Sequence, residues 1–119
     1  MLASHSIRFG SSPAHKEIWK GKTTAPHGNF GVGERVFKGF VYNDGAYDVV
    51  VTLDGATDDA GYGQDWTNRA SVTVKAGGNA ILQGCIRGTE TFYRFAVQSA
   101  SGETSGRIDI FDVSNNLLR

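Results

Sequence analysis

The sequence predicts an all-β protein, an antiparallel two-sheet sandwich or jelly roll with an extended N-terminal arm. Several segments alternate apolar and polar residues with a period of two, which is typical of strands with one buried face. Glycine accounts for 16 of the 119 residues, roughly twice its average share, and it lies mainly between these segments, as in turns. No segment shows a convincing helical period.

The chain divides into an arm over residues 1–33 and a sandwich domain over residues 34–119. A chain of 119 residues is long enough for one core. The first 33 residues are rich in glycine, serine and proline, with a short alternation around Ile7 and Phe9 and a second possible short strand at Glu17-Ile-Trp-Lys20. Because a long irregular stretch is unusual inside a compact domain, we interpret this segment as an arm.

Six strands are expected in the sandwich domain. The alternating segments are 35–42, 47–53, 70–76, 80–87, 91–99 and 107–113. Asn43, Asp44 and Gly45 form the strongest hairpin signal, because these residue types tolerate the positive φ that such turns require. The two strands on either side of this turn are therefore expected to be antiparallel neighbours.

The charges are balanced overall but unevenly distributed. The formal net charge is zero, which gives no general attraction to nucleic acid, and no nucleic-acid partner is expected. Residues 1–40 carry six basic and two acidic residues, whereas residues 41–66 carry six aspartates and no basic residue. These two parts can pair within one chain or between neighbouring copies.

Compartment signals are few. Cys85 is the single cysteine, so no intrachain disulfide is possible and no oxidising compartment is required. The first residues lack the charged start and apolar run of a signal peptide, and no apolar run approaches membrane-spanning length. We expect an intracellular origin and no membrane partner.

The acidic, glycine-rich loop after residue 53 is a weak candidate for a calcium site. Asp54, Asp58, Asp59 and Asp65 lie within twelve residues of one another, and Ca²⁺ prefers several oxygen ligands on a flexible loop. Their spacing does not match the EF-hand pattern, and aspartate and glycine are common in solvated turns. No bound metal is therefore expected.

The same loop contains aromatic residues that suit a sugar platform or a contact with a neighbouring copy. Tyr62 and Trp66 lie among Asp58, Asp59 and Asp65. Aromatic faces beside polar groups are suited to carbohydrate. In a sandwich, however, a tryptophan at the end of a loop more often caps the core, because its large apolar face is costly to expose.

No catalytic signature is present, and we expect neither an enzyme nor a cofactor. His5, His15 and His27 lack the closely spaced pair that zinc sites usually show. The glycine-rich segment 28–33 lacks the strand, loop and helix context of a phosphate-binding loop. The aspartates of the acidic loop have no defined separation that would make them a hydrolytic pair.

These features together resemble the small decoration, or cement, proteins on the heads of tailed bacteriophages. The segments that carry the resemblance are the arm Ser4 to Gly33 and the strand patterns Tyr47-Asp-Val-Val-Val-Thr-Leu, Ser71-Val-Thr-Val-Lys and Tyr93-Arg-Phe-Ala-Val. They cover most of the chain at the level of pattern. The resemblance implies a protein made in the host cytoplasm and located on the capsid surface of the virion.

The resemblance also implies how the protein would bind. Its partner would be the major capsid protein at junctions between subunits, and the protein would be a homo-oligomer, often a trimer. An arm that orders on a partner can cover a large area. The predicted contacts are the apolar residues Ile7, Phe9, Trp19 and Phe30 and the basic residues Arg8, Lys16, Lys20 and Lys22.

Two alternatives remain open. One is a carbohydrate-binding or host-attachment module that uses the acidic loop and its aromatic residues. The other is a head-tail connector or minor tail protein of the same kind of virion. Burial of the arm in the native assembly favours decoration, whereas burial of Tyr62 and Trp66 favours attachment.

Overall fold

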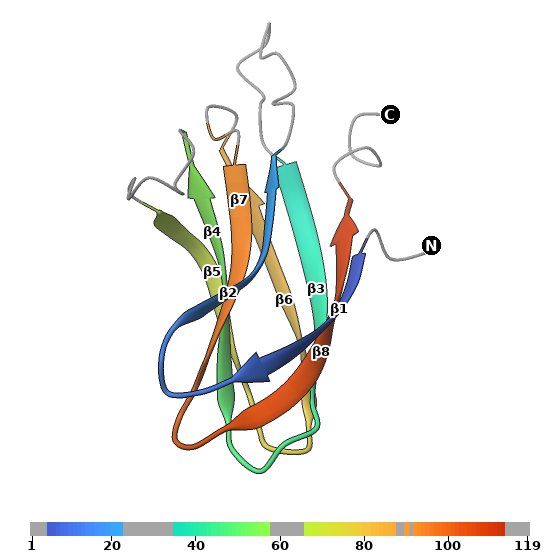
Figure 1. Ribbon diagram of the computed structural model, residues 1–119. Coiled ribbons are helices and arrows are strands. Elements are labelled where there is room, and N and C mark those ends of the chain that lie inside the picture. The colour runs from blue at the N-terminus through green and yellow to red at the C-terminus, as the bar shows by residue number, and fades with distance from the viewer. Residues whose placement is uncertain (1–4, 23–34, 58–65, 88–89, 91, 114–119) are drawn as a thin grey trace, which may run out of the picture.

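The protein is a sandwich of two antiparallel four-stranded sheets (Figure 1). A computed structural model describes residues 5–22, 35–57, 66–87, 90 and 92–113. Its strands are β1 (His5–Ser11), β2 (Lys16–Lys22), β3 (Arg35–Asn43), β4 (Val49–Ala56), β5 (Thr67–Val74), β6 (Asn79–Ile86), β7 (Phe92–Ser99) and β8 (Thr104–Asp112). Within the described residues there is no helix long and apolar enough to span a membrane.

The chain passes repeatedly from one sheet to the other. Sheet A has the strand order β1-β8-β3-β6, and sheet B has the order β2-β7-β4-β5. Every strand pairing is antiparallel, and β4 and β5 are the one pair of successive strands that lie side by side in the same sheet. The predicted all-β, two-sheet fold is confirmed.

The described part of the predicted arm, residues 5–22, forms two strands that pair with strands of the sandwich. Strand β1 pairs along its whole length with β8, and β2 pairs with β7. The physical reason is that Ile7 and Phe9 alternate with polar residues and so supply an inward face to sheet A. The proposed boundary itself lies outside the described residues.

The turn after β3 is a crossover, so the prediction that β3 and β4 are neighbours is wrong. Strand β3 pairs with β6 and β8, whereas β4 pairs with β5 and β7. The buried Asn43 side chain holds this crossover: its Nδ2 donates to the carbonyl oxygens of Tyr47 and Val74, at 2.7 and 3.1 Å. Its Oδ1 accepts the backbone N–H of Gly45 at 3.0 Å.

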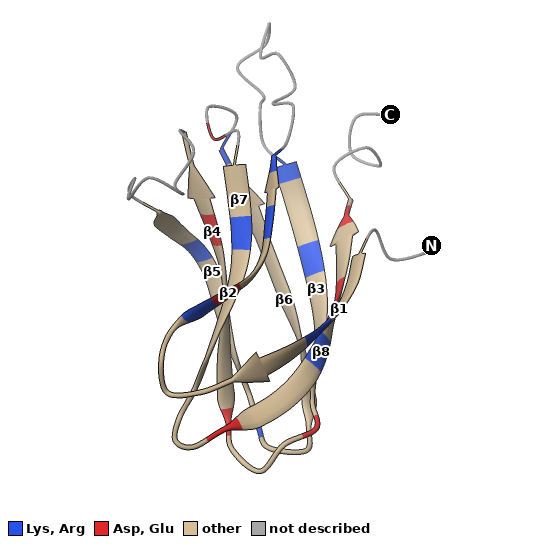
Figure 2. Ribbon diagram, viewed as in Figure 1, with Lys and Arg blue, Asp and Glu red and all other residues tan. Residues whose placement is uncertain are grey.

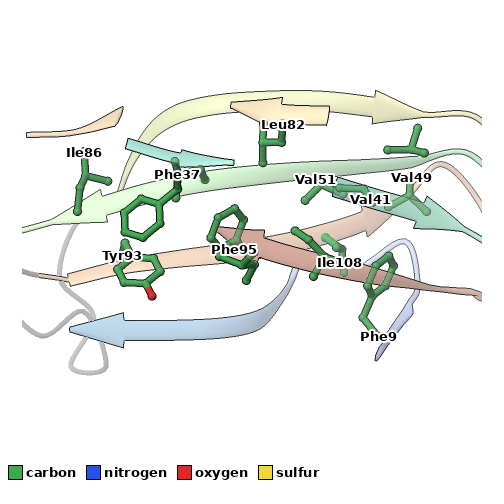
Figure 3. Packing of buried hydrophobic residues seen from close by; sticks show 14 residues of the cluster. Phe9, Phe37, Val41, Val49, Val51, Leu82, Ile86, Tyr93, Phe95 and Ile108 are labelled. Atoms are coloured by element: carbon green, nitrogen blue, oxygen red, sulfur yellow. The ribbon is translucent and has the colours of Figure 1, made fainter. Parts of the chain in front are cut away.

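A single aromatic and aliphatic core lies between the sheets (Figure 3). Phe37 of sheet A stacks on Tyr93 of sheet B, with ring centroids 4.3 Å apart. Phe95 meets both rings edge-on, at 6.2 and 6.3 Å. Aromatic pairs in these arrangements gain stability beyond their buried area. The three rings therefore join the two sheets at one end of the core.

Tyr93 makes the stability of the protein sensitive to alkaline pH. Burial raises the pKa of its hydroxyl, because the charged phenolate is poorly solvated there. The folded protein therefore holds the hydroxyl proton more tightly than the unfolded chain does. The corresponding stability is present in full below the unfolded pKa of about 10, and this stability is lost as the pH rises through the folded pKa.

We expect the free energy of unfolding to fall more steeply above pH 10 in the wild type than in Tyr93→Phe, since phenylalanine has no proton to lose. Urea denaturation across this pH range measures the two slopes. Comparing slopes also removes the pH-independent cost of losing the hydroxyl. Equal slopes would show that Tyr93 ionises without penalty.

Candidate partner-binding surface

Three of the apolar residues that were predicted to anchor the arm on a partner pack against the protein's own core. Phe9 is only 6% exposed and belongs to the core cluster. Ile7 and Trp19 are half-buried and pack against that cluster. Phe30 lies outside the described residues. Phe9 therefore has little surface open to a partner, and the predicted contacts of these residues with a partner stay predictions.

Trp19 connects β2 to β1 of the other sheet and to β7 of its own sheet. Its ring lies 4.0 Å from the ring of His5 on β1, measured between centroids. Its Nε1–H donates to the hydroxyl of Tyr93 on β7 at 3.2 Å. A half-buried tryptophan with a satisfied N–H is typical of a residue that caps a core. Trp19 thus holds the first two strands on the sandwich, and its role as a partner anchor stays a prediction.

The basic residues of the same segment remain on the surface. Arg8 has 80% of its side chain exposed, Lys16 and Lys22 are exposed, and Lys20 is half-buried. They lie on β1 and β2, which are the edge strands of sheets A and B on one side of the sandwich. We call this side, with these four residues, the basic flank; it appears as blue segments along β1 and β2 in Figure 2.

Little negative charge offsets the basic flank among the residues of β1 and β2. Glu17 is the one acidic residue in these two strands. Arg8 approaches Asp44 at 3.9 Å, but both side chains are more than half exposed, and such exposed pairs contribute about 0–1 kcal/mol. The flank therefore offers a row of basic groups that a partner surface can reach.

Asp54, a member of the predicted acidic loop, lies on β4 and is paired within the protein. It stands opposite Arg94 on β7, whose Nε donates to Asp54 Oδ2 at 2.8 Å. Asn68 Nδ2 donates to the other carboxylate oxygen at 3.4 Å. The Arg94 guanidinium also lies 4.6 Å from the centre of the half-buried Trp66 ring. This row crosses the outer face of sheet B.

A second ion pair is buried next to this row. Arg69 donates to both carboxylate oxygens of Glu90, at 3.1 and 2.8 Å from Nε and Nη2. Glu90 also accepts the backbone N–H of Arg87 at 2.7 Å. The hydrogen bond to Glu90 raises the pKa of Arg69 above its usual value. The pair ties Glu90 to Arg69 on β5.

The rest of the predicted loop site is not described. Asp58, Asp59, Tyr62 and Asp65 lie outside the described residues, so the sugar and calcium predictions for them stay predictions. Among the residues that the structure describes, no group of three or more histidine, cysteine, aspartate or glutamate side chains is placed to hold a metal ion.

The outer face of sheet A carries an aromatic group that the sequence interpretation did not single out. Phe40 on β3 and Phe111 on β8 meet edge-on, with ring centroids 5.3 Å apart. Ile81 on β6 stands opposite Phe40 in the register and is 56% exposed. The sequence did contain a signal for this group, because both faces of β3 are partly apolar. The group itself could not be predicted, because only the strand order brings these side chains together.

Two open hollows lie beside the strands. One, of about 350 Å³, is at the β1–β2 turn, where the buried Ser11 hydroxyl has no hydrogen-bond partner among the described residues. The other, of about 320 Å³, lies between Arg69 and Arg87 beside β6. The first hollow is lined by Gly10, Ser11, Ser12, Lys16, Glu103 and Thr104, and the second by Arg69, Cys85, Ile86 and Arg87.

Comparison with known proteins gives a fold and no family. No protein-family model and no curated protein matches the sequence. In structure the chain is similar to PirA, with a TM-score of 0.61 and 14% identity over 92% of this chain and 96% of that chain. It is also similar to a protein of the disulfide-linked pili of Bacillus endospore appendages, with a TM-score of 0.56 and 13% identity over 89% of this chain and 80% of that chain.

A third similarity covers 90% of this chain but only 26% of the other, the Clostridium thermocellum xylanase 10B fragment that joins CBM22-1 and GH10 modules, solved with xylohexaose. Its TM-score is 0.49 at 13% identity. At the identities of the other two structures, similarity shows the β-sandwich fold alone.

Proposed function

We propose that the protein is a structural virion subunit that binds an assembled phage capsid at junctions between major capsid subunits. The observation that carries the proposal is the basic flank, where Arg8, Lys16 and Lys22 are exposed on the two edge strands of one side. Its partner is an acidic surface on the major capsid protein. The protein would then be located on the capsid surface.

Rigidity supports this assignment. Because Phe9 and Trp19 pack internally, the flank is built on paired strands and is already in place before a partner binds. A preformed surface pays less conformational entropy on binding than an arm that must order. Charge complementarity at such a surface mainly speeds association and selects the partner.

The fold is compatible with a repeating assembly. The structurally similar Bacillus protein is a component of pili, so a sandwich with a similar arrangement serves there as a building block. Among the described residues, the ion pairs Arg94–Asp54 and Arg69–Glu90, both at 2.8 Å, connect segments of this protein to one another.

A cosedimentation experiment tests the proposal. We expect Lys16→Glu/Lys22→Glu to bind assembled capsids of the encoding virus at least tenfold more weakly than the wild type, because it reverses two charges on the flank. Lys38→Glu/Lys75→Glu makes the same change in net charge on other strands or turns and should bind normally. Wild-type binding by the flank variant would contradict the proposal.

Sugar binding is the second candidate, because the half-buried Trp66 ring lies in a polar row with Arg94, Asp54 and Asn68. Arg94 already occupies a position over that ring, which reduces the aromatic area open to a sugar. Binding of the wild type to a glycan array that is lost in Trp66→Ala, without binding to capsids, would favour this candidate over the capsid proposal.

A further inference from the structure

Strand β6 differs from the other three edge strands of the sandwich. Its eight residues, Asn79–Ile86, include no charged residue and no proline, and it pairs with β3 without a register shift. Edge strands are normally protected from pairing with other chains by charges, prolines or bulges. By this measure β6 is unprotected.

The other edges carry such protection. Strand β1 contains Arg8, and β2 contains Lys16, Lys20 and Lys22 together with a bulge after Glu17. Strand β5 contains Arg69 and meets an irregularity in its pairing with β4. Two copies of β2 placed side by side would oppose lysines to lysines, which is unfavourable. This contrast indicates that β6 is the edge strand most open to pairing with another chain.

The hydrogen-bond pattern identifies the backbone groups at the open edge. The N–H of Asn43 donates to the carbonyl of Gly78 at 2.9 Å, which makes this a hydrogen-bonded pair of the β3–β6 ladder. Because such pairs alternate along antiparallel strands, Ala80 and Leu82 direct their backbone groups toward β3. Asn79, Ile81 and Gln83 therefore direct theirs away from β3, where sheet A has no further strand among the described residues.

We propose that β6 is a self-association edge, at which two copies of the protein pair antiparallel about a two-fold axis. Sheet A would then continue through both copies as one eight-stranded sheet. The register centred on Leu82, which overlaps residues 79–85, pairs the outward-directed backbone groups with one another. It sets Ile81 opposite Gln83 of the second copy. Both residues are exposed and uncharged, so no charge has to be buried or opposed.

The charges at the two ends of β6 favour the antiparallel arrangement over a parallel one. Next to the Ile86 end lies the exposed Arg87. Near the Asn79 end lies Asp48, which accepts the backbone N–H of Ala76 and has Lys75 3.8 Å away. Antiparallel pairing about a two-fold keeps the two Arg87 side chains at opposite ends. Parallel pairing would instead bring them together.

The inference goes beyond the proposed function and does not depend on it. The β6 edge lies on the side of sheet A opposite β1, so self-association leaves the basic flank open. An isologous pairing makes dimers, and a cyclic trimer would need β6 to meet a different surface of the next copy. The mass of the purified protein therefore separates the two arrangements without any capsid.

Light scattering of the purified full chain, over a range of concentrations, tests the inference. We expect the wild type to approach twice its 12.8 kDa chain mass as concentration rises. Ile81→Lys/Gln83→Lys should raise the dimer dissociation constant at least tenfold, because it places lysines against lysines across the two-fold. Gln83→Pro removes one outward N–H and should weaken the dimer as well.

The matched control is Ser71→Lys/Thr73→Lys, which adds the same two charges at exposed positions on β5, the edge of sheet B. It should dimerise like the wild type. Melting temperatures confirm that each variant is folded. A wild type that stays monomeric at the highest concentration, that forms trimers, or that associates equally well in the β6 variants would overturn the inference.

Discussion

Replacing Phe95 with alanine is expected to lower the free energy of unfolding by about 3–5 kcal/mol, the usual cost of removing a fully buried aromatic ring. Phe95 is fully buried and contacts the rings of Phe37 and Tyr93 edge-on. A domain of this kind is typically stable by about 5–15 kcal/mol, so the loss is a large share of the total. Urea denaturation at neutral pH measures it.

The matched control is Phe111→Ala. Phe111 is also a strand phenylalanine with an edge-on aromatic neighbour, but it lies half-buried on the outer face of sheet A. Its truncation removes less buried area and opens no internal cavity, so we expect a loss of about 1 kcal/mol. If both variants lost the same stability, the core described between the sheets would be wrong.

Replacing Arg69 with methionine is expected to destabilise the protein by about 3 kcal/mol, because it leaves a buried carboxylate without its cation. The Glu90 side chain is 5% exposed and that of Arg69 is 22% exposed. The backbone N–H of Arg87 remains as a partner of Glu90 but cannot replace the lost charge. Thermal or urea denaturation measures the change.

The double variant Arg69→Met/Glu90→Leu distinguishes the cost of removing the whole ion pair from the cost of leaving one charge unpaired. Apolar residues of similar volume often replace a buried ion pair at little cost. We therefore expect the double variant to be more stable than Arg69→Met alone. As a control, Arg107→Met removes the partner of Asp109 from a more exposed pair and should cost about 1 kcal/mol or less. A double variant less stable than the single would refute the account of this pair.

Alternation along the chain predicted most strands, because burial of one sheet face requires an apolar residue at every second position. The same alternation was present in β1 and β2, at Ile7, Phe9 and Trp19. Their assignment to an arm followed from the glycine, serine and proline around them. Composition could not show that β1 pairs with β8, a strand about a hundred residues away, since local pattern carries no information on distant partners.

The lack of information on distant partners also explains why the strand pairing at the turn after β3 and the environment of Asp54 were not predicted. Asn43, Asp44 and Gly45 did mark a chain reversal, but turn composition does not say whether the chain returns in the same sheet. Asp54 looked like part of a solvated acidic loop because its partner, Arg94, is 40 positions away. Arg8, Lys16 and Lys22 remain on the surface, whereas Ile7, Phe9 and Trp19 could be assigned to the core only from the fold.

Electron cryomicroscopy of virions that carry the protein tests the central claim most directly. The account predicts density for the sandwich at junctions between major capsid subunits, with β1 and β2 facing the shell and Arg8, Lys16 and Lys22 within reach of acidic residues. Particles with no such density, or a sandwich bound to the shell by another face with the basic flank turned to solvent, would contradict it.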